Sequence, residues 1–219
     1  MLEQLINELT PQNVELVAVS KTKPNEAILE CYEKGQRIFG ENYIQELATK
    51  YESLPKDIIW YFIGHLQSNK VKVIAPFVHL IQSVDSFKLL GEINKRAKQN
   101  DRTINCLLQF HIATEASKFG LDLETARAFL ESEAFKNLEN VNLCGVMGMA
   151  TFTSDKAQVR TEFKALKNIF DTLKSEFFAD KADFKDISMG MSGDYKMAVE
   201  EGSTMVRVGS LIFGKRAYK

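Results

Sequence analysis

Short runs rich in β-branched and aromatic residues recur along the chain, and between them lie longer stretches in which apolar residues repeat every three or four positions. The short runs predict strands, and the longer stretches predict helices that bury one face. Strands that alternate with helices predict a parallel sheet, and eight of them predict an α/β fold of the (β/α)8 TIM-barrel type. The eight predicted strands are residues 16–20, 37–40, 58–64, 79–84, 104–112, 142–150, 186–191 and 204–210.

The stretches between the predicted strands contain residues that begin and end helices. Pro24 suits the first turn of a helix that Gly35 ends, and Asp85-Ser86-Phe87 opens another. The longest predicted helix covers residues 155–178, and an extra amphipathic helix over residues 1–10 precedes the first strand. An open doubly wound sheet is the alternative fold, but it would normally carry a glycine-rich dinucleotide turn, which this sequence lacks.

The composition favours one barrel domain over residues 1–219, because no Ser/Gly/Pro-rich linker divides the chain. Its 28 basic and 29 acidic residues nearly cancel, so the bulk charge favours neither nucleic acid nor an anionic membrane surface as a partner. Cys31, Cys106 and Cys144 lie far apart in apolar stretches, as reduced thiols do, and their spacing suits neither a disulfide framework nor a metal site. The N-terminus lacks the features of a signal peptide, and the apolar runs are too short to cross a bilayer. We therefore expect a cytoplasmic protein.

A lysine, Lys21, directly follows the first predicted strand. The active sites of these barrels lie at the carboxyl ends of the strands, which is where Lys21 is expected. Burial lowers the pKa of a lysine and makes its amine nucleophilic, as the formation of a Schiff base with an aldehyde requires. The alternative is that Lys21 only opens a solvated loop before the helix that begins near Pro24.

The loops after the seventh and eighth predicted strands contain small residues of the kind that bind phosphate. Ser192 and Gly193 lead from a strand into a helix, and Ser192 can cap that helix so that its free N–H groups face an anion. Gly209 and Ser210 supply the second half of such a site after the eighth strand, where phosphate sites recur in this fold. Alternatively, Ser192 is a plain N-cap and Gly209 merely ends a strand.

An arginine, Arg207, lies within the eighth predicted strand, where alternation places Val206 and Val208 on one face and Arg207 on the other. If the valines pack outward against the helices, Arg207 points into the barrel, where an unpaired charge is costly. A bound ligand with an acceptor atom is the simplest partner for it. A nucleophilic lysine, a phosphate site and an inward arginine together suit pyridoxal 5′-phosphate (PLP), with the aldehyde on Lys21 and the pyridine nitrogen facing Arg207.

Six motifs, spread in order over nearly the whole chain, resemble those of the YggS/PROSC family of pyridoxal phosphate homeostasis proteins. They cover residues 18–24, 39–43, 62–70, 143–147, 188–192 and 202–209. The resemblance implies an alanine-racemase-like barrel that carries the cofactor on Lys21. Asn42 and Met149 at strand ends and Ser188 in the seventh strand complete the candidate cofactor-binding residues.

One departure from the family pattern lies in the fifth strand. Where family members usually carry an asparagine-centred pattern, this chain has Gln109-Phe110-His111, although the following Glu115-Ala116-Ser117-Lys118 still matches. The polar contact that the family pattern implies at this position is therefore not carried over to His111. Glu41 and His65, at other strand ends, suit a contact with the cofactor ring and a structural hydrogen bond equally well.

The resemblance to racemases raises the question of catalysis. Racemisation needs two acid/base groups, one on each face of the substrate. In the related racemases the second group is a tyrosine from a separate C-terminal domain, whereas this chain ends nine residues after Ser210, and Tyr218 lies next to the terminus. An arginine at the ring nitrogen also disfavours protonation there, which weakens the cofactor as an electron sink.

We therefore expect a monomeric carrier without catalytic residues, which buffers PLP and passes it to PLP-dependent apo-enzymes. Two alternatives remain open. One is a weak PLP-dependent amino-acid racemase or transaminase. The other is a lysine-dependent aldolase for a sugar phosphate, which would be colourless as purified.

Overall fold

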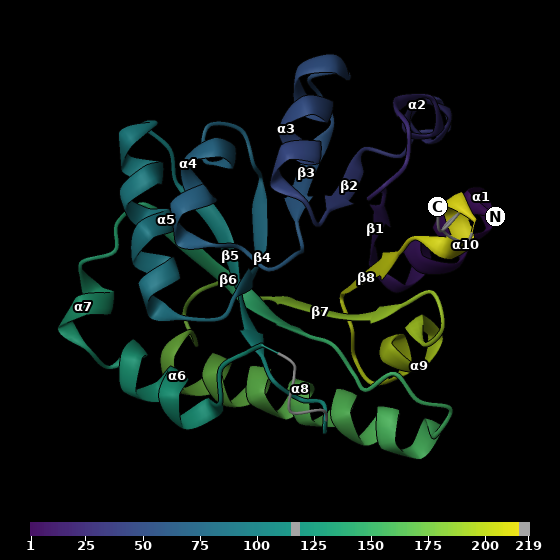
Figure 1. Ribbon diagram of the computed structural model, residues 1–219. Coiled ribbons are helices and arrows are strands. Elements are labelled where there is room, and N and C mark those ends of the chain that lie inside the picture. Colours follow the sequence, from purple (N-terminus) through teal and green to yellow (C-terminus); the bar gives the residue numbers. More distant parts are fainter. Residues whose placement is uncertain (115–118, 215–219) are drawn as a thin grey trace.

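The computed structural model describes residues 1–114 and 119–214, and within them eight parallel strands form a closed barrel (Figure 1). The strands are β1 (Glu15–Val19), β2 (Ile38–Glu41), β3 (Ile59–Phe62), β4 (Leu80–Val84), β5 (Ile104–Phe110), β6 (Val141–Gly148), β7 (Asp186–Met191) and β8 (Met205–Val208). Each strand pairs with the next in sequence, and β1 also pairs with β8, with Ala18 opposite Val208. The predicted barrel is therefore confirmed, and the open sheet is wrong.

Every predicted strand overlaps an observed one, but several end earlier than predicted. β6 ends at Gly148 and β8 at Val208, so Met149 and Ser210 lie beyond them. The pairing of β8 stops because the backbone turns at Gly209, whose φ of −118° and ψ of −66° lead into the short helix α10 (Ser210–Phe213).

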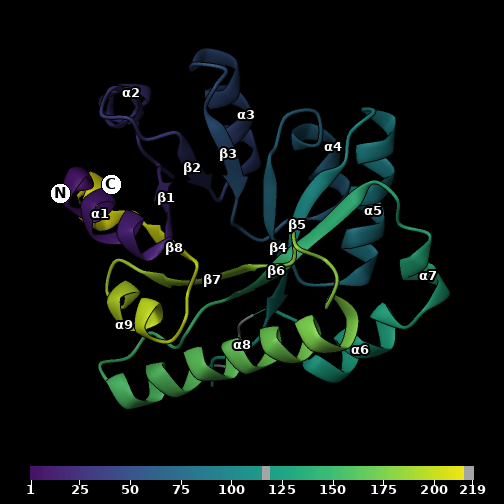
Figure 2. The same ribbon diagram turned by 180° about the vertical axis from the view of Figure 1, so that it is seen from behind.

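Helices surround the barrel (Figures 1 and 2). They are α1 (Leu2–Leu9), α2 (Asn25–Glu33), α3 (Ile44–Ser53), α4 (Val71–Ile74), α5 (Phe87–Gln99), α6 (Leu123–Leu130), α7 (Glu133–Lys136), α8 (Lys156–Phe177), α9 (Tyr195–Glu200) and α10, with 3-10 helices η1 (Thr10–Gln12) and η2 (Ser68–Lys70). For α2, α5 and α8, the residues predicted to begin and end helices do so, with one difference at the start of α2. Pro24 is the N-cap of α2 and not part of its first turn, because its ψ of 162° is extended, and Gly35 follows the helix at φ +92°. Ser86 and Asp155 cap α5 and α8 through side-chain oxygens that accept backbone N–H groups.

Apolar side chains form two layers on opposite sides of the strand wall. The inner layer fills the barrel with Val17, Tyr61, Leu80, Leu107, Cys144, Met147 and Met205. The larger outer layer lies between strands and helices and includes Val206 and Val208. The valines of β8 thus pack outward, as predicted, and alternation turns Met205 and Arg207 to the interior.

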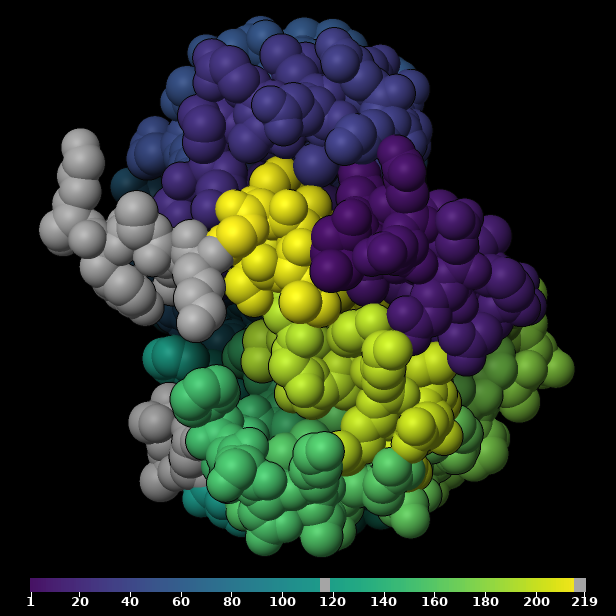
Figure 3. All heavy atoms as spheres, turned by 90° about the vertical axis from the view of Figure 1, so that its right-hand side faces the viewer, coloured from purple at the N-terminus to yellow at the C-terminus, as the bar shows by residue number. Residues whose placement is uncertain are grey.

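The first and last described elements lie side by side. Figures 1 and 2 show α1 beside α10, and Figure 3 shows the yellow C-terminal residues packed against the purple N-terminal ones. Lys23 Nζ donates a hydrogen bond of 2.8 Å to the Phe213 carbonyl oxygen, which ties the segment after β1 to α10. Cys31, Cys106 and Cys144 are buried free thiols. Within residues 1–114 and 119–214, no helix is both long and apolar enough to cross a membrane.

Candidate functional site

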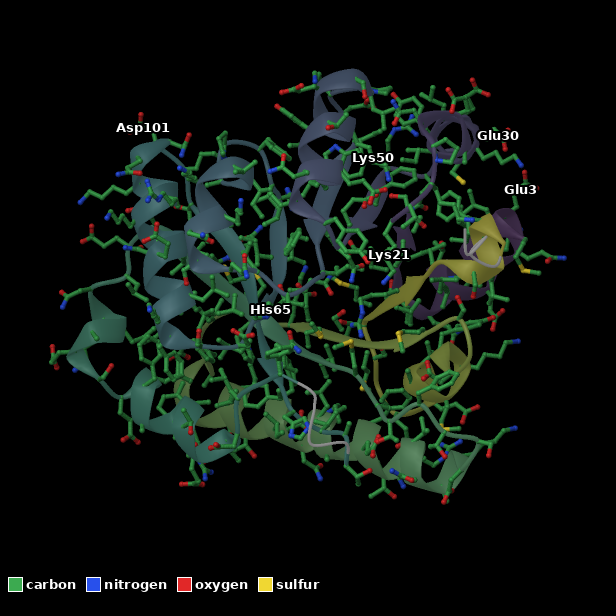
Figure 4. The ribbon with its side chains drawn as sticks, in the orientation of Figure 1. Glu3, Lys21, Glu30, Lys50, His65 and Asp101 are labelled. Atoms are coloured by element: carbon green, nitrogen blue, oxygen red, sulfur yellow. The ribbon has the colours of Figure 1, made fainter. Side chains whose placement is uncertain are left out.

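Lys21 lies in a tight turn at the carboxyl end of β1. The turn is closed by a hydrogen bond of 3.0 Å from Lys23 N–H to the Ser20 carbonyl oxygen. Thr22 has φ +63°, so the chain reverses sharply just after Lys21. Figure 4 shows Lys21 near β1, and the side chain is partly buried. The structure therefore places Lys21 at the barrel end where the sequence predicts it.

Arg207 is a buried cation inside the barrel, with 5% of its surface exposed. Its Nη1 donates to Ser188 Oγ at 2.6 Å, and its Nη2 donates to the Gly148 carbonyl oxygen at 2.9 Å. Both acceptors are neutral oxygens. Desolvation lowers the pKa of Arg207 to about 10, and the charge of Asp194 opposes this effect. The guanidinium therefore remains protonated at neutral pH.

Ser188 holds the guanidinium group of Arg207 in place. Its hydroxyl accepts from Arg207 and donates to Gln82 Oε1 at 2.7 Å, and Gln82 Nε2 in turn contacts Met205 Sδ at 2.9 Å. One hydroxyl has a single proton to donate, and here Gln82 receives it. Ser188 is thus placed to orient the arginine across the barrel interior.

The loops after β7 and β8 meet, as predicted, but not through a helix cap. Ser192 Oγ accepts a hydrogen bond of 3.2 Å from Gly209 N–H, which joins the two loops. The prediction that Ser192 caps the following helix is wrong, because α9 begins only at Tyr195 and its N-cap is Asp194. Asp194 Oδ1 accepts from Met191 N–H at 2.5 Å and closes the intervening turn.

Two glycines shape the space at these loops. Among the described residues, a Cβ atom at Gly193 would meet no heavy atom within 4 Å, so it would point into open space between them. A Cβ atom at Gly209 would come within 3.1 Å of the Val19 carbonyl oxygen, so this glycine lets the β8 loop approach the end of β1. Ser210, the first residue of α10, is exposed beside it. The two loops therefore approach the end of β1 and leave space at Gly193.

Asn42 and Met149 lie at two other strand ends. Asn42 Oδ1 is buried and has no hydrogen-bond partner among the described residues, so it offers an acceptor to a ligand. Asn42 also lines a cavity of about 360 Å³ together with His65. Met149 packs against the inner apolar layer of the barrel. Both positions suit contact with a ring at the barrel mouth.

Glu41 and His65 have protein partners. Glu41 Oε1 accepts from Ser20 Oγ at 2.6 Å and from Lys50 Nζ at 2.7 Å, so this carboxylate faces α3 and not the barrel mouth. His65 Nδ1 lies 3.2 Å from Asp85 Oδ2, and its ring stacks on Phe119. These contacts of Glu41 Oε1 and His65 are thus structural hydrogen bonds to other residues of the chain.

The ion-pair network behind the site is what sequence reasoning missed. The spacing of Glu46 and Lys50, four residues apart on α3, predicts a helix-surface pair. No local signal shows that Lys50 also reaches Ser20 and Glu41. The motif Glu115-Ala116-Ser117-Lys118 and Tyr218 lie outside the described residues. His111 is exposed just after β5.

The sequence matches the family model of the alanine racemase N-terminal domain over residues 2–217. It is 39% identical over 214 residues to the pyridoxal phosphate homeostasis protein of Vibrio alginolyticus, covering 95% of this chain and 89% of that one. The Homo sapiens protein of the same name is 40% identical over 213 residues, covering 93% of this chain and 77% of that one. The chain belongs to the pyridoxal phosphate homeostasis protein family.

The structural neighbours agree with this family. The structure of PipY from Synechococcus elongatus without PLP has a TM-score of 0.90 at 34% identity and covers 97% of this chain and 98% of that one. The structure of PipY with PLP bound has a TM-score of 0.85 at 32% identity and covers 98% of this chain and 100% of that one. An alanine racemase from Clostridium difficile, at 13% identity and a TM-score of 0.71, shares the fold; this chain covers 56% of it.

Proposed function

We propose that this protein holds pyridoxal 5′-phosphate as a Schiff base on Lys21 and acts in intracellular homeostasis of that cofactor. The observation that carries the proposal is the position of Lys21 at the end of a barrel that contains a buried cation, Arg207, and whose β7 and β8 loops meet at Ser192 and Gly209. The names of the relatives and the PLP bound to PipY support the choice of ligand.

The chemistry needs only an amine and an aldehyde, which PLP supplies when bound. The neutral Lys21 amine adds to the aldehyde carbon, and a C=N bond replaces the C=O bond as water leaves with the aldehyde oxygen and both amine protons. Hydrolysis reverses this step without an oxidant or a reductant. The same lysine can therefore take up the cofactor and release it.

The other candidate residues would hold the phosphate and the ring. Ser192, Gly193, Gly209 and Ser210 would bind the phosphate, and the open space at Gly193 supports that assignment. Arg207, oriented by Ser188, would face the ring nitrogen.

Two residues would flank the ring itself. Asn42, whose Oδ1 has no partner among the described residues, would accept a hydrogen bond from the ring hydroxyl group. Met149 would pack against the ring.

The decisive experiment is the absorption spectrum of the protein with PLP, followed by borohydride reduction and peptide mapping. The wild type should show the visible Schiff-base band and carry the reduced cofactor on Lys21. Lys21→Ala should lose both, whereas Lys23→Ala, the neighbouring lysine control, should keep them. A full band in Lys21→Ala would refute the proposal, and a colourless wild type trapped only with a sugar phosphate would identify an aldolase.

A carrier role is favoured over catalysis by the charge of Arg207. A cation beside the ring nitrogen disfavours protonation there and weakens the electron withdrawal that carbanion chemistry needs. We expect no exchange of the α-proton of alanine into deuterated water beyond that of free PLP. Sustained exchange that depends on Lys21 would instead identify a weak racemase or transaminase.

We further propose that the loaded protein works as a cytoplasmic monomer and passes PLP to apo-enzymes. Light scattering should give the mass of one chain. Loaded protein should reactivate an apo-aminotransferase faster than the rate at which it releases PLP into solution. Reactivation limited by that release rate would refute direct transfer.

A further inference from the structure

A buried ammonium group lies on the outer side of the strand wall, behind the turn that carries Lys21. Lys50 extends from α3, and only 4% of its surface is exposed. Its Nζ donates to Ser20 O at 2.8 Å, to Glu41 Oε1 at 2.7 Å and to Glu46 Oε1 at 2.6 Å. These three acceptors use all three ammonium protons. Figure 4 shows Lys50 at α3, on the same side of the barrel as Lys21.

The first set of contacts holds the residue before Lys21. Lys50 binds the Ser20 carbonyl oxygen, and Ser20 Oγ donates to Glu41 Oε1 at 2.6 Å. Ser20 N–H also donates to the Gly40 carbonyl oxygen at 3.1 Å. The backbone and the side chain of Ser20 are therefore both held against β2 and α3.

The second set holds the residue after Lys21. Thr22 N–H donates to Glu46 Oε1 at 2.6 Å, the same oxygen that accepts from Lys50. At φ +63°, Thr22 adopts a left-handed conformation that is unfavourable for a residue other than glycine. The hydrogen bond to Glu46 stabilises that conformation, so Lys21 is held on both sides by one network.

Stability alone does not explain this network. Glu41 is fully buried, and desolvation raises its pKa although Lys50 lies beside it. Its Oε2 has no hydrogen-bond partner among the described residues. Replacing a buried ion pair by two apolar side chains often costs no stability, because the cost of desolvating the ions offsets their attraction. An apolar pair, however, would offer no donor to the carbonyl group of Ser20.

We propose that Lys50 is a positioning residue for Lys21: its hydrogen bonds keep the turn of residues 20–22 in the conformation that presents the Lys21 amine to an aldehyde. The inference rests on the proposed function, because it concerns the same Schiff base. When the turn is loosened, a smaller fraction of molecules is competent, and the apparent affinity falls in proportion to that fraction.

The test is the double variant Lys50→Met/Glu41→Gln, which removes the two buried charges together; Glu46 also loses Lys50 as a partner, but its side chain is 22% exposed and keeps access to water. PLP is compared with pyridoxine 5′-phosphate, which has no aldehyde and cannot form a Schiff base, by fluorescence titration. We expect PLP to bind about tenfold more weakly, as it would if one molecule in ten kept a competent turn. Pyridoxine 5′-phosphate should bind within about twofold of wild type, because the phosphate loops are untouched.

Two further variants complete the test. Glu92→Gln/Arg96→Met neutralises an ion pair on α5 whose side chains are 22% and 27% exposed, away from the Lys21 turn, and should bind both ligands as the wild type does. Glu46→Ala removes the Thr22 contact at a side chain that is 22% exposed, and should reproduce the selective loss of PLP even if the double variant does not fold.

Equal losses for both ligands, or unchanged affinity for PLP in both Lys50→Met/Glu41→Gln and Glu46→Ala, would overturn the positioning role. Failure of the proposed function has a different signature, because Lys21→Ala would then keep the Schiff-base band. If Lys21→Ala loses the band while the network variants bind PLP normally, only the role of Lys50 is wrong.

Discussion

A methyl group at Gly193 should weaken the binding of PLP without weakening the fold. The added carbon meets no heavy atom of residues 1–114 and 119–214 within 4 Å, and the φ of Gly193 lies outside the left-handed region. A glycine-to-alanine change at such a position stabilises a protein by about 0.4–1 kcal/mol, since the unfolded chain has fewer conformations to lose. The free energy of unfolding of Gly193→Ala should therefore equal or slightly exceed that of the wild type.

The loss of affinity follows from where the methyl group lies. It enters the open space beside the joined β7 and β8 loops, where the phosphate is proposed to bind. Displacing a phosphate oxygen from one backbone N–H removes a charge-assisted hydrogen bond of about 1.5–3 kcal/mol. Since 1.4 kcal/mol is a factor of ten, the dissociation constant should rise roughly 10- to 150-fold.

The assay pairs a PLP titration with urea denaturation of the unliganded protein. Gly91→Ala on α5 is the matched control, because a Cβ atom there also meets no atom of the described part of the chain within 4 Å. It should raise stability by roughly 1 kcal/mol, as expected for alanine in a helix, and leave the affinity unchanged. If Gly193→Ala binds PLP within twofold of wild type, the assignment of the phosphate to this loop is wrong.

Three further predictions concern stability. Burial raises the pKa of Asp186 from 3.8 to about 6, so the folded state favours the protonated acid, and its ionisation reduces stability as pH rises from 4 through 6. Asp186→Asn should therefore raise the free energy of unfolding in urea by up to about 3 kcal/mol at pH 8 and by little at pH 4; equal gains at both would contradict the reasoning. Ser188→Ala should lower the free energy of unfolding by about 1.5–3 kcal/mol, because the buried Arg207 loses a hydrogen-bond acceptor. A loss below about 0.5 kcal/mol would mean that Arg207 finds another acceptor. Phe163→Ala, at a fully buried position on α8, should cost about 3–5 kcal/mol and lower the melting temperature measured by circular dichroism; an unchanged melting temperature would show that the α8 core is not as described.

Sequence reasoning reached most of the candidate site because its residues lie at strand ends. A closed barrel of eight parallel strands brings the carboxyl ends of β1, β7 and β8 to one face. Lys21, Ser192 and Gly209 come just after these strands and therefore lie at that face. The cap assigned to Ser192 is wrong because the length of the turn before α9 depends on Asp194 closing on Met191 N–H. Such a contact leaves no periodic pattern in the sequence.

The role of Glu41 shows the same limit. A carboxylate just inside a strand end suits either a ligand or a structural bond, and the sequence does not distinguish the two. The structure turns Glu41 outward to Lys50, because the pleat of β2 places successive side chains on opposite faces. A one-residue shift of β2 would have aimed this carboxylate into the barrel.

The order of strands and helices, the outward valines of β8 and the inward Arg207 were determined by the sequence alone, because the periods of strands and helices are local properties of the chain. Only the tertiary structure decided that Ser192 meets Gly209 and that Lys50 reaches Ser20. Residues this far apart along the chain come together only when β8 closes on β1 and α3 packs on the wall, and burial then determines which polar groups must find partners.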